Sequence, residues 1–180
     1  LPAWLFRRPR AFVEVLVELW SRGVPSWQNC QETFLGFGFG LVRAEEFRRE
    51  GFTFCHAVWS TLPATAALVI RKLVGIDFSI GAHAYDVFRD GGDCLLALKI
   101  REAAFVRTSS EATKRRLLLL GSPLEKIVLI RRGLDKFPAI RKRDTDGTLS
   151  ILSVGRLVSK KGYYLQLAIY RALADAGIPF

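Results

Sequence analysis

The sequence lacks methionine altogether and contains only two histidines and three cysteines. The cysteines, Cys30, Cys55 and Cys94, are widely spaced and form no Cys-x-x-Cys pair. An odd and sparse set of this kind argues against a disulfide framework and a zinc site, and it favours a reducing compartment. Because a complete translation product begins with methionine, we expect a processed chain or a fragment of a longer protein.

Uncharged runs long enough to cross a membrane are also scarce, and residues 51–70 are the candidate. This window contains Pro63 and several His, Ser and Thr residues, which weaken a transmembrane interpretation. We predict instead a buried strand that turns into a helix. The start of the chain does not read as a secretory signal peptide, because its basic residues follow the apolar ones.

Basic residues, by contrast, are abundant. The chain carries a formal net charge of +10, while half of its residues are apolar. The apolar content argues against disorder. The charge calls for an anionic partner, which could be nucleic acid, anionic lipid or a phosphorylated small molecule. Most of the basic clusters, such as Lys160-Lys161, are expected to be solvated helix faces and loop ends.

Short apolar segments alternate with amphipathic ones from residue 52 onward. Strands are predicted at 52–57, 77–81, 104–107, 126–130 and 149–154, and helices at 8–22, 27–50, 62–74, 94–103, 109–120 and around 165–173. This alternation is typical of parallel α/β units. Thr108-Ser-Ser-Glu111 reads as a capping box for helix 109–120. Gly36, Gly38 and Gly40 interrupt the helical pattern of 27–50, so the sequence does not predict the conformation of that part.

A polar and charged stretch divides the chain. Residues 138–148 have the composition of a linker. The sequence therefore predicts one α/β domain over residues 1–137 and the beginning of a second over residues 149–180.

The start of that second part carries the clearest chemical signal. Residues 149–162, Leu-Ser-Ile-Leu-Ser-Val-Gly-Arg-Leu-Val-Ser-Lys-Lys-Gly, predict a strand, a Gly-Arg turn and the opening of a helix. This arrangement aims backbone N–H groups at an anion. Arg156 can grip two phosphate oxygens at once, and Lys161 adds a point charge. The turn suits a diphosphate, and the alternative is a plain solvated basic loop.

Four patterns occur in order along residues 53–180. They are Phe54-Cys-His56-Ala-Val58 with Pro63-Ala-Thr-Ala-Ala67, then Phe78-Ser-Ile-Gly-Ala-His83-Ala-Tyr-Asp86, then Thr108-Ser-Ser-Glu111 leading to Lys126–Asp135, and finally Gly155-Arg156 with Lys161-Gly162. Together they resemble the family 4 glycosyltransferases of the GT-B fold, nearest to the exopolysaccharide and colanic-acid type. The chain departs from that family at Val58, where a second His is usual, and at Arg132, where Asn is common.

The resemblance implies part of an N-terminal, acceptor-side Rossmann-like domain and the first β-α unit of a second Rossmann-like domain. The whole protein would be a retaining enzyme that moves a sugar from a nucleoside diphosphate sugar to a saccharide or lipid-linked acceptor in polysaccharide biosynthesis. Gly155, Arg156 and Lys161 would bind the donor diphosphate, and His83 and Asp86 would be catalytic. No metal and no further cofactor is implied, because these cations balance the leaving charge.

The same resemblance indicates an incomplete and inactive chain. The family's Gly-rich first loop would precede Leu1, and its Glu-x7-Glu segment would follow Phe180, since no Glu occurs after Glu125. His83 could also be a structural histidine satisfied by backbone, and Asp86 could cap a short helix at 85–89. We expect His56 to be structural.

The aromatic and basic N-terminus offers a possible membrane contact. Trp4, Phe6, Phe12 and Trp20 accompany Arg7, Arg8 and Arg10, a combination that suits an anionic interface. The competing interpretation is a core-packed helix pair with a basic outer face. We expect a cytoplasmic protein that lies peripherally at the inner membrane face and binds no nucleic acid. The alternative function is a basic α/β module that binds anionic lipid or nucleic acid without catalysis.

Overall fold

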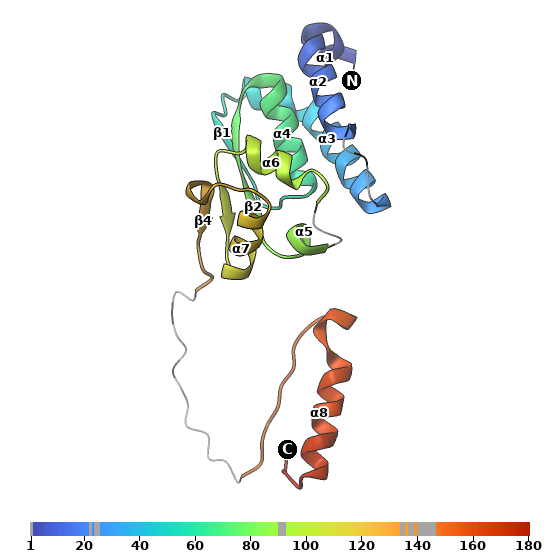
Figure 1. The fold of residues 1–180 in the computed structure, drawn as a ribbon, viewed down its shortest axis with the longest axis vertical. Coiled ribbons are helices and arrows are strands. Elements are labelled where there is room, and N and C mark those ends of the chain that lie inside the picture. Colours follow the sequence, from blue (N-terminus) through green and yellow to red (C-terminus); the bar gives the residue numbers. More distant parts are fainter. Residues whose placement is uncertain are drawn as a thin grey trace. The chain divides into compact units, whose positions relative to one another are not determined.

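A computed structural model of the chain describes residues 2–21, 23, 26–89, 93–133, 136, 139 and 147–180. The chain divides into two compact units, Leu1–Gly133 and Leu134–Phe180. The predicted linker at 138–148 lies almost entirely outside the described residues. Figure 1 shows both units, coloured along the sequence from blue to red.

The first unit contains a four-stranded parallel sheet in the order β1-β2-β3-β4. Its strands are β1 (Phe54–Ala57), β2 (Asp77–Ala82), β3 (Val106–Thr108) and β4 (Ile127–Leu129). Ala57 lies opposite Ile80, and Ile80 lies opposite Val106. The prediction of a mixed α/β chain with a parallel sheet is therefore confirmed, and this architecture is compatible with a Rossmann-like fold.

Helices precede the sheet and connect its strands. They are α1 (Pro2–Arg7), α2 (Pro9–Trp20), α3 (Trp27–Arg49), α4 (Leu62–Val74), α5 (Tyr85–Phe88), α6 (Leu96–Glu102) and α7 (Glu111–Leu119), with α8 (Tyr163–Asp175) in the second unit. Helix α4 has the predicted bounds. It ends at Gly75, whose φ of 81° gives the left-handed C-cap that only glycine adopts at little cost. None of the described helices is both long and apolar enough for a membrane span.

The core lies between the sheet and its connecting helices. Strand order advances in one direction, and crossovers between parallel strands are right-handed, so the connecting helices share one face of the sheet. Phe78 and Ile80 of β2 are completely buried there, together with Leu73 of α4. On the opposite face, Phe54 and Val128 stay 42% and 38% exposed. One face of the sheet is therefore packed and the other is partly open.

The glycines of α3 have different surroundings. A Cβ on Gly36 would lie 2.6 Å from Thr65 Cβ, and one on Gly40 would lie 2.6 Å from Val69 Cβ. A Cβ on Gly38 would meet nothing within 4 Å. The part of α3 whose conformation the sequence did not predict is therefore regular helix. Gly36 and Gly40 allow α3 to approach α4 closely.

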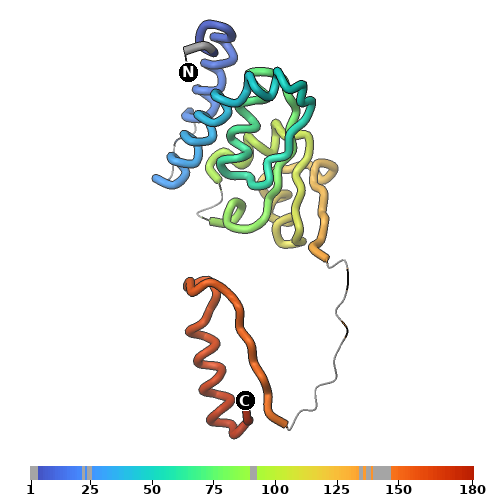
Figure 2. Tube along the Cα trace, turned by 180° about the vertical axis from the view of Figure 1, so that it is seen from behind, coloured from blue at the N-terminus to red at the C-terminus, as the bar shows by residue number. Residues whose placement is uncertain are grey.

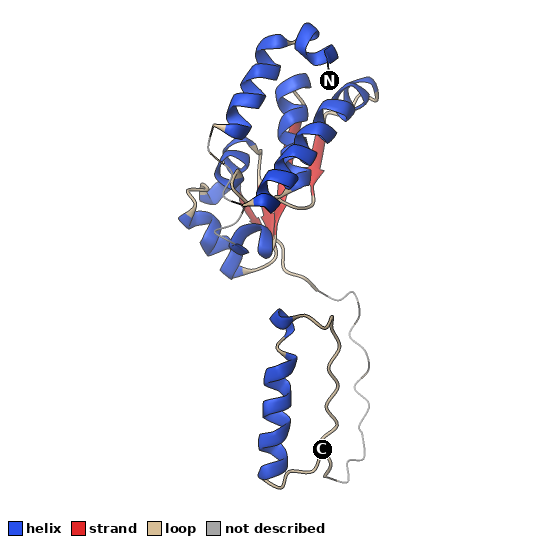
Figure 3. Cartoon of the chain, turned by 90° about the vertical axis from the view of Figure 1, so that its right-hand side faces the viewer, coloured by secondary structure: helices blue, strands red, loops and turns tan. Residues whose placement is uncertain are grey.

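Two local predictions are wrong. The cap of α7 is Ser110, whose Oγ accepts a hydrogen bond from the Thr113 backbone N–H at 3.1 Å. Thr108 instead belongs to β3, because its backbone continues the sheet. Residues 149–154 form no strand, as Figure 3 shows, since the described part of the second unit offers them no neighbouring strand.

The second unit is a helix with an extended segment beside it. Figure 2 follows this segment from residue 147 as it runs alongside α8, and the Leu149 N–H donates to Pro179 O at 2.9 Å. The predicted helix is present as α8, but none of its residues is buried. Among the described residues of this unit, no helix or strand covers its apolar stripe.

Candidate functional site

The first candidate site lies where the parallel strands end. The loop after β1 begins at Val58, and the loop after β2 begins at His83. Carboxyl ends of parallel strands meet at one edge of a sheet, which is the usual ligand-binding edge of open α/β sheets. The predicted residues His83 and Asp86 both belong to this edge.

Asp86 connects the two loops. Its buried carboxylate accepts hydrogen bonds from the Ser60 hydroxyl at 2.8 Å and from the backbone N–H groups of Ala84 at 2.7 Å and His83 at 3.2 Å. Each of these donors lies on the loop after β1 or the loop after β2. Among the described residues, no hydrogen bond joins the carboxylate to the His83 imidazole. Asp86 therefore orients the backbone of His83 and Ala84, not the His83 ring.

A buried ion pair holds the same loop from its other side. Lys99 on α6 is fully buried, and its Nζ lies 2.8 Å from Asp93 Oδ1. It also donates to Ser60 O at 2.8 Å and to Thr61 O at 3.0 Å. Burial lowers the pKa of Lys99, and the Asp93 carboxylate opposes that shift. Ser60 is therefore fixed through its hydroxyl by Asp86 and through its carbonyl by Lys99.

The His83 ring also bonds to the backbone. Its Nε2 lies 3.0 Å from Val58 O, and because a carbonyl only accepts, the proton is on Nε2. Nδ1 is then the acceptor nitrogen, and it is buried without a hydrogen-bond partner among the described residues. This geometry matches the alternative of a histidine satisfied by backbone, and a catalytic role would require the ring to release Val58 O or to use Nδ1.

One aromatic ring lies against this histidine, and a second lies against the first. The Trp59 ring lies edge-on to His83 with centroids 5.0 Å apart, and it lies 5.6 Å from the Tyr85 ring. The Arg89 guanidinium lies 5.0 Å from the Tyr85 centroid and pairs with Glu32 at 3.3 Å. Trp59 and Tyr85 are each 38% exposed. The edge therefore presents aromatic surface with a cation beside it.

His56 lies on β1 and contacts β2, a position that fits the structural role expected for it. Its Nδ1 lies 2.8 Å from the Ser79 hydroxyl. Burial, and after it the positive charge of Arg107, lowers its pKa. A neutral imidazole that bridges β1 to β2 fits this position.

The second candidate site is the loop at the start of α8. Residues Ser159–Lys161 form a 3-10 turn, and Gly162 precedes the helix with φ 68° and no side-chain cap. A Cβ on Gly155 would lie 3.7 Å from Lys161 Cδ and 3.0 Å from Tyr163 Oη. Arg156 and Lys161 are exposed. The loop thus brings Gly155 against Lys161 at a helix start whose first N–H groups have no side-chain acceptor.

Sequence reasoning missed several members of the first site. Trp59, Ser60, Asp93 and Lys99 were not singled out, although a lysine between Leu98 and Ile100 in an apolar helix is itself a signal of a buried partner. Of the residues predicted from the sequence, His83 and Asp86 lie here, and the His83 backbone N–H donates to the Asp86 carboxylate. The predicted donor residues Gly155, Arg156 and Lys161 all belong to the second unit.

Groups of metal ligands are absent from the described residues, in which no three His, Cys, Asp or Glu side chains come together. The sequence contains one Asp-x-Asp pattern, Asp144-Thr145-Asp146, which lies outside them. Comparison with known proteins gives no match to a family model, to a curated protein or to a solved structure.

Proposed function

We propose that this chain is part of a retaining GT-B glycosyltransferase that transfers a sugar from a nucleoside diphosphate sugar to a saccharide or lipid-linked acceptor. The observation that carries the proposal is the loop at the start of α8. Gly155 lies against Lys161, Arg156 is adjacent in sequence, and the helix begins without a side-chain cap. Two cations beside a helix start without a side-chain cap suit a diphosphate.

The chemistry assigns separate roles to these residues. Departure of a nucleoside diphosphate builds negative charge on its oxygens, and fixed positive groups lower the free energy of that transition state. Arg156 would hold two of the oxygens and Lys161 a third, with no metal required. A Cβ at position 155 would lie against Tyr163 Oη and narrow the approach of an anion to the backbone.

The first unit would hold the acceptor. Trp59 and Tyr85 offer half-exposed aromatic rings beside Arg89, and such surfaces suit the mixed polar and apolar faces of a saccharide. The proposal gives His83 and Asp86 the sugar-facing role that the resemblance implies. Their contacts make that role one of positioning, because they hold Val58, Ser60 and the loop that carries Trp59.

The test measures binding of UDP, GDP and inorganic pyrophosphate to the chain by calorimetry. We expect Arg156→Ala to weaken binding about tenfold, equivalent to about 1.4 kcal/mol. Lys160→Ala is the matched control, since Lys160 is an adjacent exposed lysine outside the Gly155, Arg156 and Lys161 set, and it should leave affinity within about twofold. Equal losses in both variants, or no nucleotide binding, would contradict the donor site.

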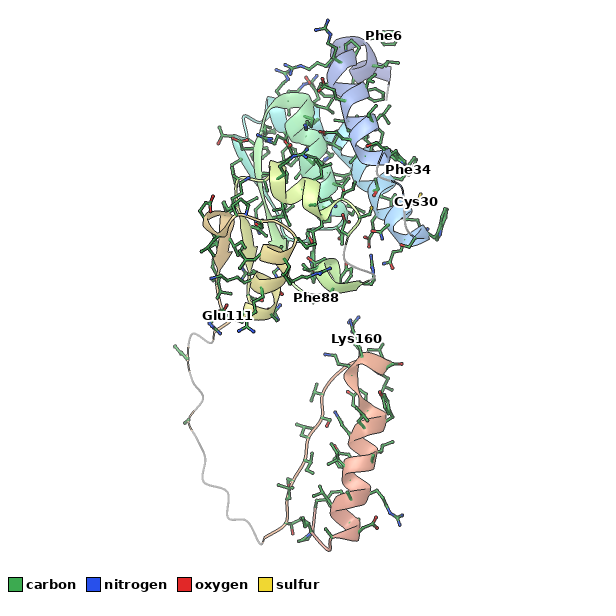
Figure 4. The ribbon with its side chains drawn as sticks, in the orientation of Figure 1. Phe6, Cys30, Phe34, Phe88, Glu111 and Lys160 are labelled. Atoms are coloured by element: carbon green, nitrogen blue, oxygen red, sulfur yellow. The ribbon has the colours of Figure 1, made fainter. Side chains whose placement is uncertain are left out.

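A peripheral contact with anionic membrane stays part of the proposal, with different residues. Trp4 is buried and donates its ring N–H to Leu41 O, and Phe12 and Trp20 pack against the core, so only Phe6 of the four aromatics is free. Figure 4 shows Phe6 and Phe34 on the same side of the unit. Phe6, Trp27 and Phe34 are 80%, 75% and 64% exposed.

Vesicle flotation tests that contact. We expect the chain to float with vesicles that contain phosphatidylglycerol and to remain behind with pure phosphatidylcholine, because the net charge is positive. Binding that falls with salt but is indifferent to Phe34→Ser would favour the alternative function, a basic module that attaches by charge alone.

A further inference from the structure

Hydrogen bonds hold the backbone of His83 on both sides of its side chain. The His83 N–H lies 3.2 Å from both carboxylate oxygens of Asp86, and Thr113 Oγ1 donates to His83 O at 2.9 Å. Asp86 and Thr113 are both buried. The main chain at His83 is therefore fixed, and only the side-chain torsions decide where the imidazole points.

Gly81, near the end of β2, leaves the space in which the imidazole meets the loop after β1. A Cβ on Gly81 would overlap Val58 O and would lie 2.9 Å from His83 Nε2. A backbone carbonyl cannot rotate aside as the end of a long side chain can. The hydrogen bond between Nε2 and Val58 O therefore requires a residue without a Cβ at position 81.

Lys99 holds the next part of the same loop. Its ammonium group donates to Ser60 O at 2.8 Å, to Thr61 O at 3.0 Å and to Asp93 Oδ1 at 2.8 Å. An ammonium group has three N–H donors, so these contacts use all of them. Because the side chain is fully buried, water does not compete for these donors. The loop is therefore held at two successive carbonyl groups beyond Val58.

Asp86 alone leaves the Ser60 carbonyl free to move. The carboxylate bonds to the Ser60 hydroxyl at 2.8 Å, whereas the Ser60 N–H is 3.5 Å away. Because the hydroxyl is joined to the main chain through rotatable bonds, this contact tolerates a shift of the loop. Lys99 bonds to the carbonyl itself, and it therefore restricts the main chain that leads from Val58.

We propose that Gly81 and Lys99 are positioning residues for His83. They hold the loop after β1 where the carbonyl of Val58 keeps the imidazole bonded through its Nε2–H. In a neutral imidazole, the bond made by one nitrogen determines the role of the other, so Nδ1 is the accepting nitrogen. An accepting nitrogen pairs with a hydroxyl and not with an ionised phosphate oxygen, which only accepts. The use of this nitrogen by a sugar hydroxyl rests on the proposed function, whereas the position of the ring is a property of the free chain.

The experiment observes the His83 ring N–H by heteronuclear NMR of the whole chain, with no ligand added. The chain has only two histidines, so His56, which bonds to Ser79 on the neighbouring strand, serves as the internal reference. A ring N–H that is bonded to a carbonyl exchanges slowly with water and gives a visible signal. We expect such a signal from His83 Nε2 in the unmodified chain.

One added methyl group tests the glycine. Gly81→Ala should abolish the His83 signal, because the new Cβ separates Val58 O from the imidazole. Gly38→Ala is the matched control, since its Cβ meets nothing within 4 Å, and it should leave the signal unchanged. The His56 signals should keep their positions in both variants, which verifies that the sheet is intact.

The lysine is tested in a variant that leaves no unpaired charge. Asp93→Asn with Lys99→Met removes both charges of the buried pair, and the asparagine keeps an acceptor for the Leu95 N–H. Exchange of the His83 ring N–H should become at least about tenfold faster, because the loop after β1 loses its bonds to the cation.

Lys126→Met is the control for that variant. Lys126 also donates to two backbone carbonyls, Arg101 O at 2.8 Å and Ala103 O at 2.9 Å, but these lie at the end of α6 and not in the loop after β1. Its loss should change the exchange of the His83 ring N–H less than about twofold.

Three results would overturn the proposal. The first is the absence of a protected His83 ring N–H in the unmodified chain, or its survival in Gly81→Ala. The second is equally faster exchange in the Lys99 and Lys126 variants, which would assign the effect to the general stability of α6. The third is a change of the His56 signals with every change at His83, which would assign the effect to loss of the sheet. Binding of UDP is measured separately, and its absence would contradict the donor site without altering these results.

Discussion

Residues 1–133 and 134–180 place similar apolar side chains in opposite environments. Phe78, Leu73 and Ile80 of the first unit are 0% exposed, whereas Leu152 and Val154 of the second are 87% and 88% exposed. Both units contain a regular helix of 13 residues, α4 in the first and α8 in the second. The difference shows that a helix can be set by local sequence, whereas burial needs a second element to cover it.

The two units also differ in whether a short apolar segment becomes a strand. Residues 77–82 and residues 149–154 are both short and largely uncharged, but only the former have parallel neighbours on either side. A strand is defined by inter-strand hydrogen bonds, so the isolated segment remains extended without becoming one. The predictions below test how far each unit depends on such partners.

The largest effect should come from the buried ion pair of the first unit. Lys99→Ala leaves the Asp93 carboxylate buried without its cation, and we expect a loss of about 3–5 kcal/mol in the free energy of unfolding. Urea melts followed by tryptophan fluorescence measure it. In the second unit, Arg171→Ala removes an exposed pair with Asp175 and should leave helix content unchanged by circular dichroism. A loss below about 1 kcal/mol for Lys99→Ala would refute the importance of the buried pair.

A smaller effect is expected at the contact between α3 and α4. Gly40→Ala puts a Cβ against Val69 and should destabilise the first unit by about 1–3 kcal/mol. Gly38→Ala is its control on the same helix, because its Cβ meets open space, and it should stabilise the unit by up to about 1 kcal/mol through helix propensity. Thermal melts of the two variants compare them directly. Shifts of the same sign would mean that α3 moves freely over α4.

The smallest effect concerns the partly exposed carboxylate of Glu45. Hydrogen bonding to Arg48, opposed by desolvation and assisted by Arg49, lowers the pKa of Glu45 from 4.5 to about 2. A depressed carboxyl pKa contributes stability that is complete above pH 4.5 and is lost as the pH falls toward about 2. We expect Arg48→Ala to return the Glu45 pKa toward 4.5 in an NMR titration, and Arg43→Ala to leave it unchanged, since Arg43 pairs with Glu46. Added salt should weaken the shift.

Sequence periodicity predicted most of the first unit. The bounds of α4 were predicted to the residue, because Pro63 suits the first turn of a helix and Gly75 ends one. The cap of α7 was misplaced because Glu111 completes a capping-box pattern with Thr108, whereas Ser110 has no Glu or Gln three residues later. The sequence did not show that β3 extends to Thr108 and leaves Ser110 as the cap. The glycines of α3 could not be interpreted without knowing that α4 lies against two of them.

The candidate sites were predicted unevenly for a similar reason. A pattern places His83 and Asp86 in one loop, but it cannot show that the imidazole bonds to Val58 O or that the carboxylate bonds to backbone. Contacts between distant segments, such as Lys99 with Ser60, depend on how the crossovers fold back. Trp4 is a further example. The sequence predicted it at a membrane surface, but its contact with the distant Leu41 buries it.

The two hydrogen bonds of Ser60, to Asp86 and to Lys99, have a consequence for the order of folding. Asp86 and Lys99 lie 26 and 39 residues from Ser60 along the chain. The first bond therefore needs α5 in place, and the second needs α6 in place. Closing loops of that length costs entropy before the bonds repay it, and charged groups give up water only once the partner is in place. The apolar core should therefore assemble first. The slowest step of folding should then be the removal of water from Asp86, Asp93 and Lys99 as they form their bonds. The double substitution Asp93→Leu with Lys99→Met should then accelerate folding and leave the fold unchanged.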